Sequence, residues 1–269
     1  MDAVASGDYS VAMGRGCSAT GRGSVALGGI VWIIRLTGEP NAVTYQTNIA
    51  YVKLAKYIVG LKLVDESDYT IHVATIIATN VVDDTAFITV DKTLSESALS
   101  SKPYGLLGCN ASGNSSIALA GCIKALGNDS TAEGYYTVAA GNYSHAEGHR
   151  SISSGVTSHA EGRETEASAD YSHTEGYRTM AEATASHAEG GATLASGDTA
   201  HAEGYGTVAA GNYSHAEGIG TIASGRDSHA EGYYTIATGK RSHAEGYAMH
   251  NIYLTGSNST YQIRYGGNI

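Results

Sequence analysis

The feature that most constrains the fold is a motif that returns every 14 residues. The pentad Ser144-His145-Ala146-Glu147-Gly148 recurs with little change between residues 130 and 246, and a second run of small residues separates its copies. A short fixed period is typical of a repeat array whose units bury no core alone and must stack on their neighbours. Fourteen residues are too few for a pair of helices, and two glycines in each unit weaken a helix interior. We therefore predict an all-β fold, a β-solenoid with two short strands and two turns in each repeat.

The period divides the chain into four parts. It is present in residues 1–28, stops, and resumes near residue 107. The interval between contains β-branched and aromatic runs bounded by turn residues, which predict a small inserted β domain at residues 29–106. The main array follows at residues 107–246. Residues 247–269 break the period, so we expect them to cap the last turn or to join a further module.

The composition argues against several classes of partner. The net charge of −10 disfavours nucleic acid, whose phosphates need a surplus of Lys and Arg. No run of 18 apolar residues is present, so no membrane insertion is expected. Met1 leads directly into repeat-like sequence, without the pattern of a signal peptide.

The three cysteines lack the spacing of a zinc site. Cys17 and Cys109 occupy the same position of successive turns once the insertion is removed. Stacked turns are close enough for a disulfide, but three unlinked thiols are the favoured interpretation, because such positions select small residues. Cys122 falls one position away and is expected to point elsewhere.

We number the repeat positions 1–14 from the serine that opens the pentad. Because strand side chains alternate between faces, the small residues at positions 3, 8 and 10 are predicted to lie inside the solenoid and positions 2 and 4 outside it. In the first turns positions 2 and 4 are apolar, and an outward apolar stripe is most simply covered by another copy of the chain. We therefore predict a homo-oligomer. Its predicted core residues are Val11, Met13, Val25, Leu27, Ile117 and Leu119.

The pentads at residues 10–14 and 24–28, each followed by Ala-x-Gly once the insertion is removed, resemble the head repeats of trimeric autotransporter adhesins, the YadA-like left-handed β-roll. The His-Ala-Glu form of the motif resembles repeats of bacteriophage tail-fibre and prophage surface proteins. The resemblance covers roughly residues 1–28 and 108–246. It implies a parallel homotrimer with positions 2 and 4 near the threefold axis. It further implies a fibre segment, on a virion tail fibre or a bacterial cell surface, that attaches to a host glycan or protein.

The main array departs from an apolar trimer core because its positions 2 and 4 carry His and Glu. Three interpretations are open: an ionic ladder between chains, a metal ladder that uses imidazole ligands for Zn, Ni or Fe, and solvated side chains on an exposed face. The ionic ladder is favoured, so no metal or other cofactor is predicted. Histidines paired in this way are expected to have raised pKa values, with stability greatest on the mildly acidic side of neutral. The residues concerned are His145, His159, His173, His187, His201, His215, His229 and His243, with Glu147, Glu161, Glu175, Glu189, Glu203, Glu217, Glu231 and Glu245.

Tyrosines cluster in the predicted turns, where they either stack on one another, the favoured interpretation, or contact a receptor. The candidate receptor contacts are Tyr135, Tyr136, Tyr205, Tyr233 and Tyr234. These features predict a structural attachment protein and not an enzyme, because identical His and Glu pairs along an array form no pocket and no nucleophile is singled out. One alternative is a fibre whose residues 29–106 form a depolymerase or self-processing domain, although His72 and its acidic neighbours fit no recognisable motif. A second alternative is an ice- or surface-binding solenoid.

Overall fold

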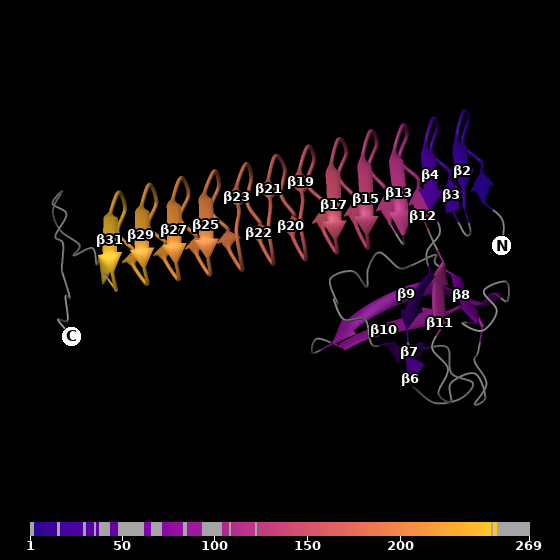
Figure 1. The fold of residues 1–269 in the computed structure, drawn as a ribbon, viewed down its shortest axis with the longest axis horizontal. Helices are drawn as coiled ribbons and strands as arrows, with labels where there is room; N and C mark the ends of the chain where they lie inside the picture. The colour runs from indigo at the N-terminus through magenta and orange to yellow at the C-terminus, as the bar shows by residue number, and fades with distance from the viewer. Residues whose placement is uncertain are drawn as a thin grey trace. The chain divides into compact units, whose positions relative to one another are not determined.

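The computed structural model describes residues 3–14, 17–28, 31–34, 36–37, 44–47, 62–65, 72–82, 85–92, 104–107, 109–121, 123–248 and 250–251. The chain divides into two compact units, residues 1–138 and residues 139–269. In each unit the repeats form a parallel β-solenoid, with one strand of every turn in each of two sheets (Figure 1). The predicted all-β solenoid with a spacing of about 14 residues is therefore confirmed.

The first unit contains the N-terminal turns and the start of the main array. One sheet has the order β1-β3-β12-β14-β16 and the other the order β2-β4-β13-β15. The first sheet is formed by β1 (Val4–Ala5), β3 (Cys17–Ala19), β12 (Cys109–Ala111), β14 (Lys124–Ala125) and β16 (Val138–Ala139). The second is formed by β2 (Val11–Met13), β4 (Val25–Gly28), β13 (Ile117–Gly121) and β15 (Thr131–Tyr135).

A separate seven-stranded sheet, with the order β5-β11-β8-β9-β10-β7-β6, lies between β4 and β12 in the sequence. Its paired strands are antiparallel, and the side chains of Ile76, Ile88 and Val90 are buried in it. The strands are β5 (Val31–Ile34), β6 (Leu36–Thr37), β7 (Thr44–Thr47), β8 (Lys62–Asp65), β9 (His72–Val82), β10 (Thr85–Val90) and β11 (Tyr104–Leu107). After it the solenoid register resumes, because Cys109 of β12 pairs with Cys17 of β3.

The second unit continues the same pattern with one strand from each turn in each sheet. One sheet contains β18 (Ile152–Ser153), β20 (Glu166–Ala167), β22 (Met180–Ala181), β24 (Leu194–Ala195), β26 (Val208–Ala209), β28 (Ile222–Ala223), β30 (Ile236–Ala237) and β32 (His250–Asn251). The other contains β17 (His145–His149), β19 (His159–Ala160), β21 (His173–Thr174), β23 (His187–Ala188), β25 (His201–Tyr205), β27 (His215–Ile219), β29 (His229–Tyr233) and β31 (His243–Tyr247). Most of the C-terminal segment predicted as a cap or junction lies outside the described residues.

The interior of most turns is filled by small side chains, as predicted, and an exception is the fully buried Ile123 at position 8. The fully buried side chains include Ala146 and Ala202 at position 3, Thr207 at position 8 and Ala209 at position 10. The serine of position 1 is buried as well: the hydroxyl of Ser144 donates to the carbonyl oxygen of Gly141 at 2.7 Å. A core this narrow buries little apolar area per residue, so the parallel backbone ladders between turns supply much of the cohesion.

The two turns of each repeat use left-handed backbone at positions 7 and 14, mostly without glycine. Arg150 and Glu164 at position 7, and Tyr143 and Thr157 at position 14, have φ angles between 58° and 62°. Glycine is needed elsewhere: Gly148 at position 5 has φ 98°, and a Cβ there would run into the carbonyl oxygen of Gly162 on the next turn. Position 5 therefore requires glycine both for its conformation and for close stacking.

Cys17 and Cys109 face each other in adjacent turns and are buried thiols, as the favoured interpretation predicted. A hydrogen bond with Cys109 is the largest influence on the Cys17 thiol and lowers its pKa. Cys122 lies outside the described residues.

Candidate functional site

The outward side chains at positions 2 and 4 form two parallel columns along one sheet. In the first unit these columns are apolar from β2 to β13, with Val11 beside Val25 and Met13 beside Leu27, and they become polar at β15, where Thr131 and Glu133 occupy positions 2 and 4. Val11 and Met13 are 45% and 63% exposed, so the columns face away from the solenoid interior as predicted. Ile117 and Leu119 extend the same columns, pairing with Val25 and Leu27, and are half-buried. The first turns thus carry an apolar strip on their outer surface.

In the second unit the position 2 column is a stack of imidazole rings. The in-register pairing of β17 to β31 places each histidine above the next, as in His187 on His201. From His145 to His229 successive ring centroids are 4.7–4.9 Å apart and the ring planes differ by 2–10°. The last step, from His229 to His243, keeps the 4.8 Å spacing but is tilted by 43°. We call these eight rings the ladder histidines.

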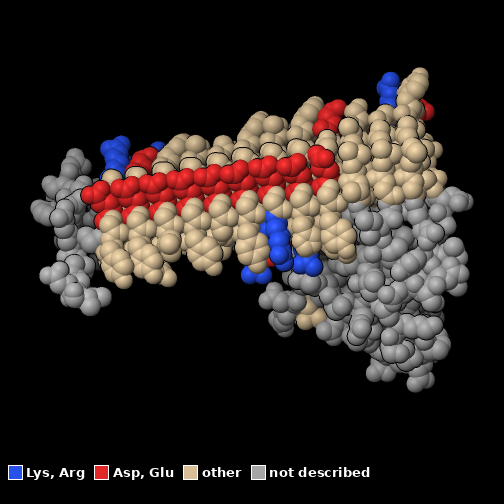
Figure 2. All heavy atoms as spheres, in the orientation of Figure 1, with Lys and Arg blue, Asp and Glu red and all other residues tan. Residues whose placement is uncertain are grey.

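The glutamates at position 4 form a second column beside the rings, and we call Glu147 to Glu245 at this position the ladder glutamates. Figure 2 shows acidic side chains as one continuous stripe, with the Lys and Arg side chains lying off it in this view. An open groove of about 700 Å³ runs along the stripe and is lined by glutamates such as Glu189 and Glu203 and by position 5 glycines. The carboxylates therefore border an accessible channel and not a closed cavity.

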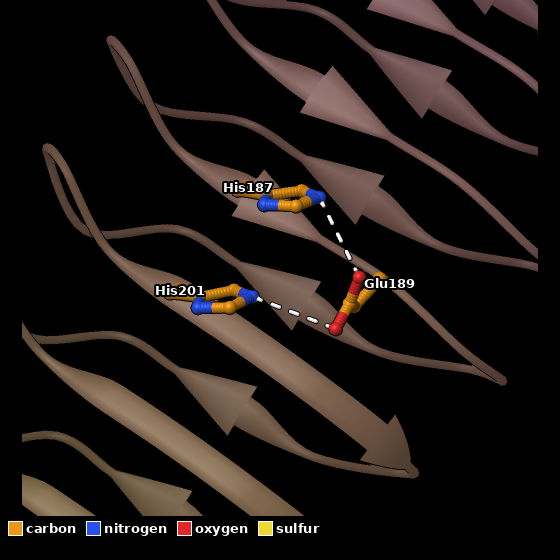
Figure 3. Close-up of side chains that lie close together, drawn as sticks. All are labelled: His187, Glu189 and His201. Carbon is orange, nitrogen blue, oxygen red and sulfur yellow. Dashed lines mark ion pairs between the residues drawn. The ribbon is translucent and has the colours of Figure 1, made fainter.

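All ladder glutamates except Glu175 lie within 4.0 Å of one or two imidazoles. The carboxylate of Glu189 directs one oxygen to His187 and the other to His201, with both oxygens 3.9 Å from the Nε2 atoms (Figure 3). Along the ladder the Nε2-to-carboxylate distances lie between 3.5 and 3.9 Å. Hydrogen bonds of this kind are about 2.7–3.2 Å long, so these contacts are too long to be hydrogen bonds. The Nε2 atoms that are shielded from solvent and make no hydrogen bond are those of His159, His173, His187, His201, His215 and His229.

Within one chain the pKa shifts of the histidines run opposite to the expectation for ionic pairs. Burial lowers the pKa of His159, His187 and His215, and the neighbouring ladder histidines lower it further. The nearby glutamates raise these pKa values but do not reverse the shift. The predicted upward shift assumed that each imidazole meets mainly carboxylates, whereas stacking places another imidazole on each face of the ring. A single chain therefore favours the neutral form of these three histidines.

The glutamates are close enough to influence one another's protonation. A hydrogen bond with Glu175, burial and a second hydrogen bond with Glu147 raise the pKa of Glu161 to about 7. Glu217 shifts the other way, because it accepts hydrogen bonds from Glu203 and Glu231, which lower its pKa. Such opposite shifts are expected where neighbouring carboxyl groups share protons. The column accordingly needs protons or other cations to offset its negative charge.

A second charged cluster lies on the turn formed by positions 6 and 7. The buried carboxylate of Glu164 is 2.8 Å from Arg178, 3.4 Å from Arg150 and 3.6 Å from Arg163. The hydrogen bond from Arg178 is the largest of the causes that lower the pKa of Glu164. The Arg163 and Arg178 guanidinium groups also lie 5.5 and 5.0 Å from the ring centre of Tyr177. This cluster was not predicted from the sequence. The sequence feature that could have indicated it is the presence of charged residues at positions 6 and 7, which in other repeats carry Tyr or Gly.

The tyrosines proposed as receptor contacts differ in exposure. Tyr205 is 63% and Tyr234 is 55% exposed, Tyr233 is less exposed, and Tyr135 is half-buried. Tyr136 is only 5% exposed and lies against Tyr135 with ring centroids 4.0 Å apart. The prediction that Tyr136 is an exposed contact is therefore wrong for this chain. The favoured interpretation, tyrosines packing on one another, holds for this pair, and Tyr233 stacks on Tyr247 at 5.1 Å.

The comparison with protein families agrees with this geometry. The family model described as YadA head domain repeat matches residues 5–29, 125–144 and 216–242. These stretches are similar to YadA head repeats. YadA head repeats are adhesin-type structural repeats, and the family they define has an attachment role at an extracellular or exposed surface. In the comparison with curated proteins no sequence matches the chain. Among the described residues no helix is long and apolar enough to span a membrane.

Proposed function

We propose that the chain is a segment of a homotrimeric attachment fibre, either a phage tail fibre or the head of a bacterial adhesin. The observation that carries this proposal is the outward apolar strip of the first unit, where Met13 and Val11 lie exposed on a regular sheet face. A column of this kind gains stability when a second copy covers it. Three parallel copies would cover every such column once, in a closed assembly.

We propose the same inward direction for the ladder face of the main array. In the trimer the ladder histidines and glutamates would face those of neighbouring copies, and pairing between chains would supply partners for the Nε2 atoms that lack them in one chain. The exposed turns would then face outward. Tyr205, Tyr233 and Tyr234 offer aromatic area there for a host glycan or surface protein. Residues 29–106 would form an inserted domain beside the fibre and residues 247–269 a cap or junction.

The oligomer is tested by the mass in solution. Light scattering across a range of micromolar concentrations should give three times the 27.7 kDa of one chain. Leu27→Asp combined with Leu119→Asp places charges in the apolar strip and should lower the mass to that of smaller species, because an unpaired buried charge is strongly unfavourable. Val156→Asp, at an exposed turn position, is the matched control and should stay trimeric. A monomeric wild-type mass over the whole range would contradict the proposal.

The attachment role is tested with the trimer itself. A fluorescent trimer should bind intact host cells, and binding should fall when Tyr205 and Tyr233 are changed to Ala while the mass stays unchanged. Tyr171→Ala, an exposed tyrosine on the opposite turn at position 14, is the matched control. Equal binding by all three proteins would place the receptor contact elsewhere.

A further inference from the structure

We propose that the ladder of the second unit binds divalent transition-metal ions of the zinc class, each held by one ladder imidazole and the glutamate beside it. The inference concerns side chains of a single chain and does not depend on the trimer. It goes beyond the attachment role, because it gives the His and Glu columns a ligand of defined chemistry.

The distances between nitrogen and oxygen are the first reason. The Nε2-to-carboxylate separations of 3.5–3.9 Å exceed a hydrogen bond. A bridging water with two hydrogen bonds of about 2.8 Å at a tetrahedral angle would need about 4.6 Å. A zinc ion bonded to both atoms at about 2.0–2.2 Å, with an angle of about 110–130°, spans about 3.4–3.8 Å. The shorter separations lie within this span and those at Glu189 lie just beyond it, so the observed gaps are nearer to a bridging metal ion than to either alternative.

The chemistry of the two groups is the second reason. Imidazole nitrogen with carboxylate oxygen is a donor set that suits zinc, whereas Ca²⁺ and Mg²⁺ prefer oxygen alone. The Nε2 atoms of His187 and His201 are shielded from solvent, make no hydrogen bond and point at Glu189. The open groove beside the glutamates gives an ion a route from solvent.

The stacking of the rings sets the stoichiometry. His187 and His201 are parallel within 4° and 4.7 Å apart. Half of that spacing already exceeds a Zn–N bond of about 2.0–2.1 Å, so one ion cannot bond to both rings without tilting them. Each ion therefore takes one imidazole, one carboxylate oxygen and water or a neighbouring copy. Because ions on adjacent turns repel each other, uptake should saturate below one ion per ladder histidine.

The test uses the untagged full chain, stripped with chelator and titrated with Zn²⁺ by calorimetry and elemental analysis. We expect more than one ion per chain. The ladder-triple variant, in which His187, His201 and His215 are changed to Asn, should lose roughly a third of the bound zinc, since three of eight ladder imidazoles are gone. Asn is chosen because it also stacks in ladders. His149→Asn, a histidine outside the ladder, is the matched control and should leave uptake unchanged.

X-ray absorption supplies the independent readout. One imidazole per zinc with the remaining ligands oxygen would support the site. Sulfur ligation by the cysteines, no uptake by the wild type, or equal uptake by the ladder-triple variant would overturn it. Should that variant fail to fold, Glu189→Gln with Glu203→Gln replaces it, with exposed Glu182→Gln as control. The trimer proposal is read separately from mass, so a monomer that binds zinc and a trimer that does not are distinguishable results.

Discussion

The narrow interior of the solenoid makes one threonine a sensitive probe of the fold. Thr174 occupies position 3, where its neighbours along the sheet are Ala160 and Ala188, and its side chain is fully buried. Its hydroxyl makes no hydrogen bond. A buried hydroxyl without a partner costs about 1–3 kcal/mol. Thr174→Val keeps the shape and removes the hydroxyl, so we expect the free energy of unfolding to rise by about 1 kcal/mol.

Thr235 is the matched control for this change. It is equally buried, at position 8, but its hydroxyl donates to the carbonyl oxygen of Glu231 at 3.0 Å. Thr235→Val removes that bond and should lower the free energy of unfolding by about 1 kcal/mol. The two chemically identical substitutions should therefore differ by about 2 kcal/mol and act in opposite directions.

Urea titrations followed by far-ultraviolet circular dichroism measure the difference. All proteins should be compared at one concentration and with chelator present, because subunit association and bound metal both add to apparent stability. Midpoints are the quantity to compare, since repeat arrays do not always unfold in one step. A fall in the Thr174→Val midpoint as large as that of Thr235→Val would refute the reasoning, because it would mean that the position 3 hydroxyl has a partner.

Two further predictions concern charged groups. With chelator present, thermal stability should fall as the pH is lowered through and below about 6.5, because the pKa of His187 is lowered: its stabilisation is full above the unfolded pKa and is lost as the imidazole becomes protonated. Glu161, whose pKa is raised to about 7, has the opposite effect between pH 4.5 and about pH 7. The test is therefore the ladder-triple variant, whose stability should depend less on pH, and an identical dependence would contradict the prediction. Glu164→Gln should lower the free energy of unfolding by about 1.5–3 kcal/mol in urea titrations, because the buried carboxylate forms a hydrogen bond with Arg178. In the native protein this stabilisation should disappear in acid, as the pH falls through the lowered pKa of Glu164. The control Glu182→Gln, at an exposed position, should change the stability little, and equal effects of the two substitutions would argue against the cluster.

The period alone was sufficient to predict much of the fold. A repeat of fixed length places equivalent residues opposite each other, so the pairing of His145 with His159, and of Cys17 with Cys109, follows from counting. The alternation of strand side chains then separates the inside from the outside, and the buried Ala146 lies where that rule places it. Turn geometry was less accessible, because left-handed residues such as Arg150 and Glu164 are neither Gly nor Asn.

The candidate site was predicted in position but not in protonation. The sequence indicates that a histidine and a glutamate share one face of each turn, yet the pKa direction depends on which groups lie closest in space. For His187 these are two other imidazoles as well as a glutamate. The Glu164 cluster escaped prediction for a related reason: its arginines come from three successive turns, and only the stacked structure brings them to one carboxylate.

The regularity that builds the solenoid also creates its main electrostatic problem. Every identical charge is repeated at the turn spacing, which the stacked rings place near 4.8 Å. Two like unit charges at that distance repel by about 3.5 kcal/mol at an effective dielectric constant of about 20 and by about 0.9 kcal/mol in bulk water. Half-exposed side chains lie between these limits, and the cost recurs at every turn. His159, His187 and His215, whose pKa values are lowered, avoid it by remaining neutral, whereas the glutamates need a shared proton, a metal ion or a neighbouring copy of the chain. Because only external cations respond to chelator and only neighbouring copies respond to dilution, those two treatments separate the means by which this face is neutralised.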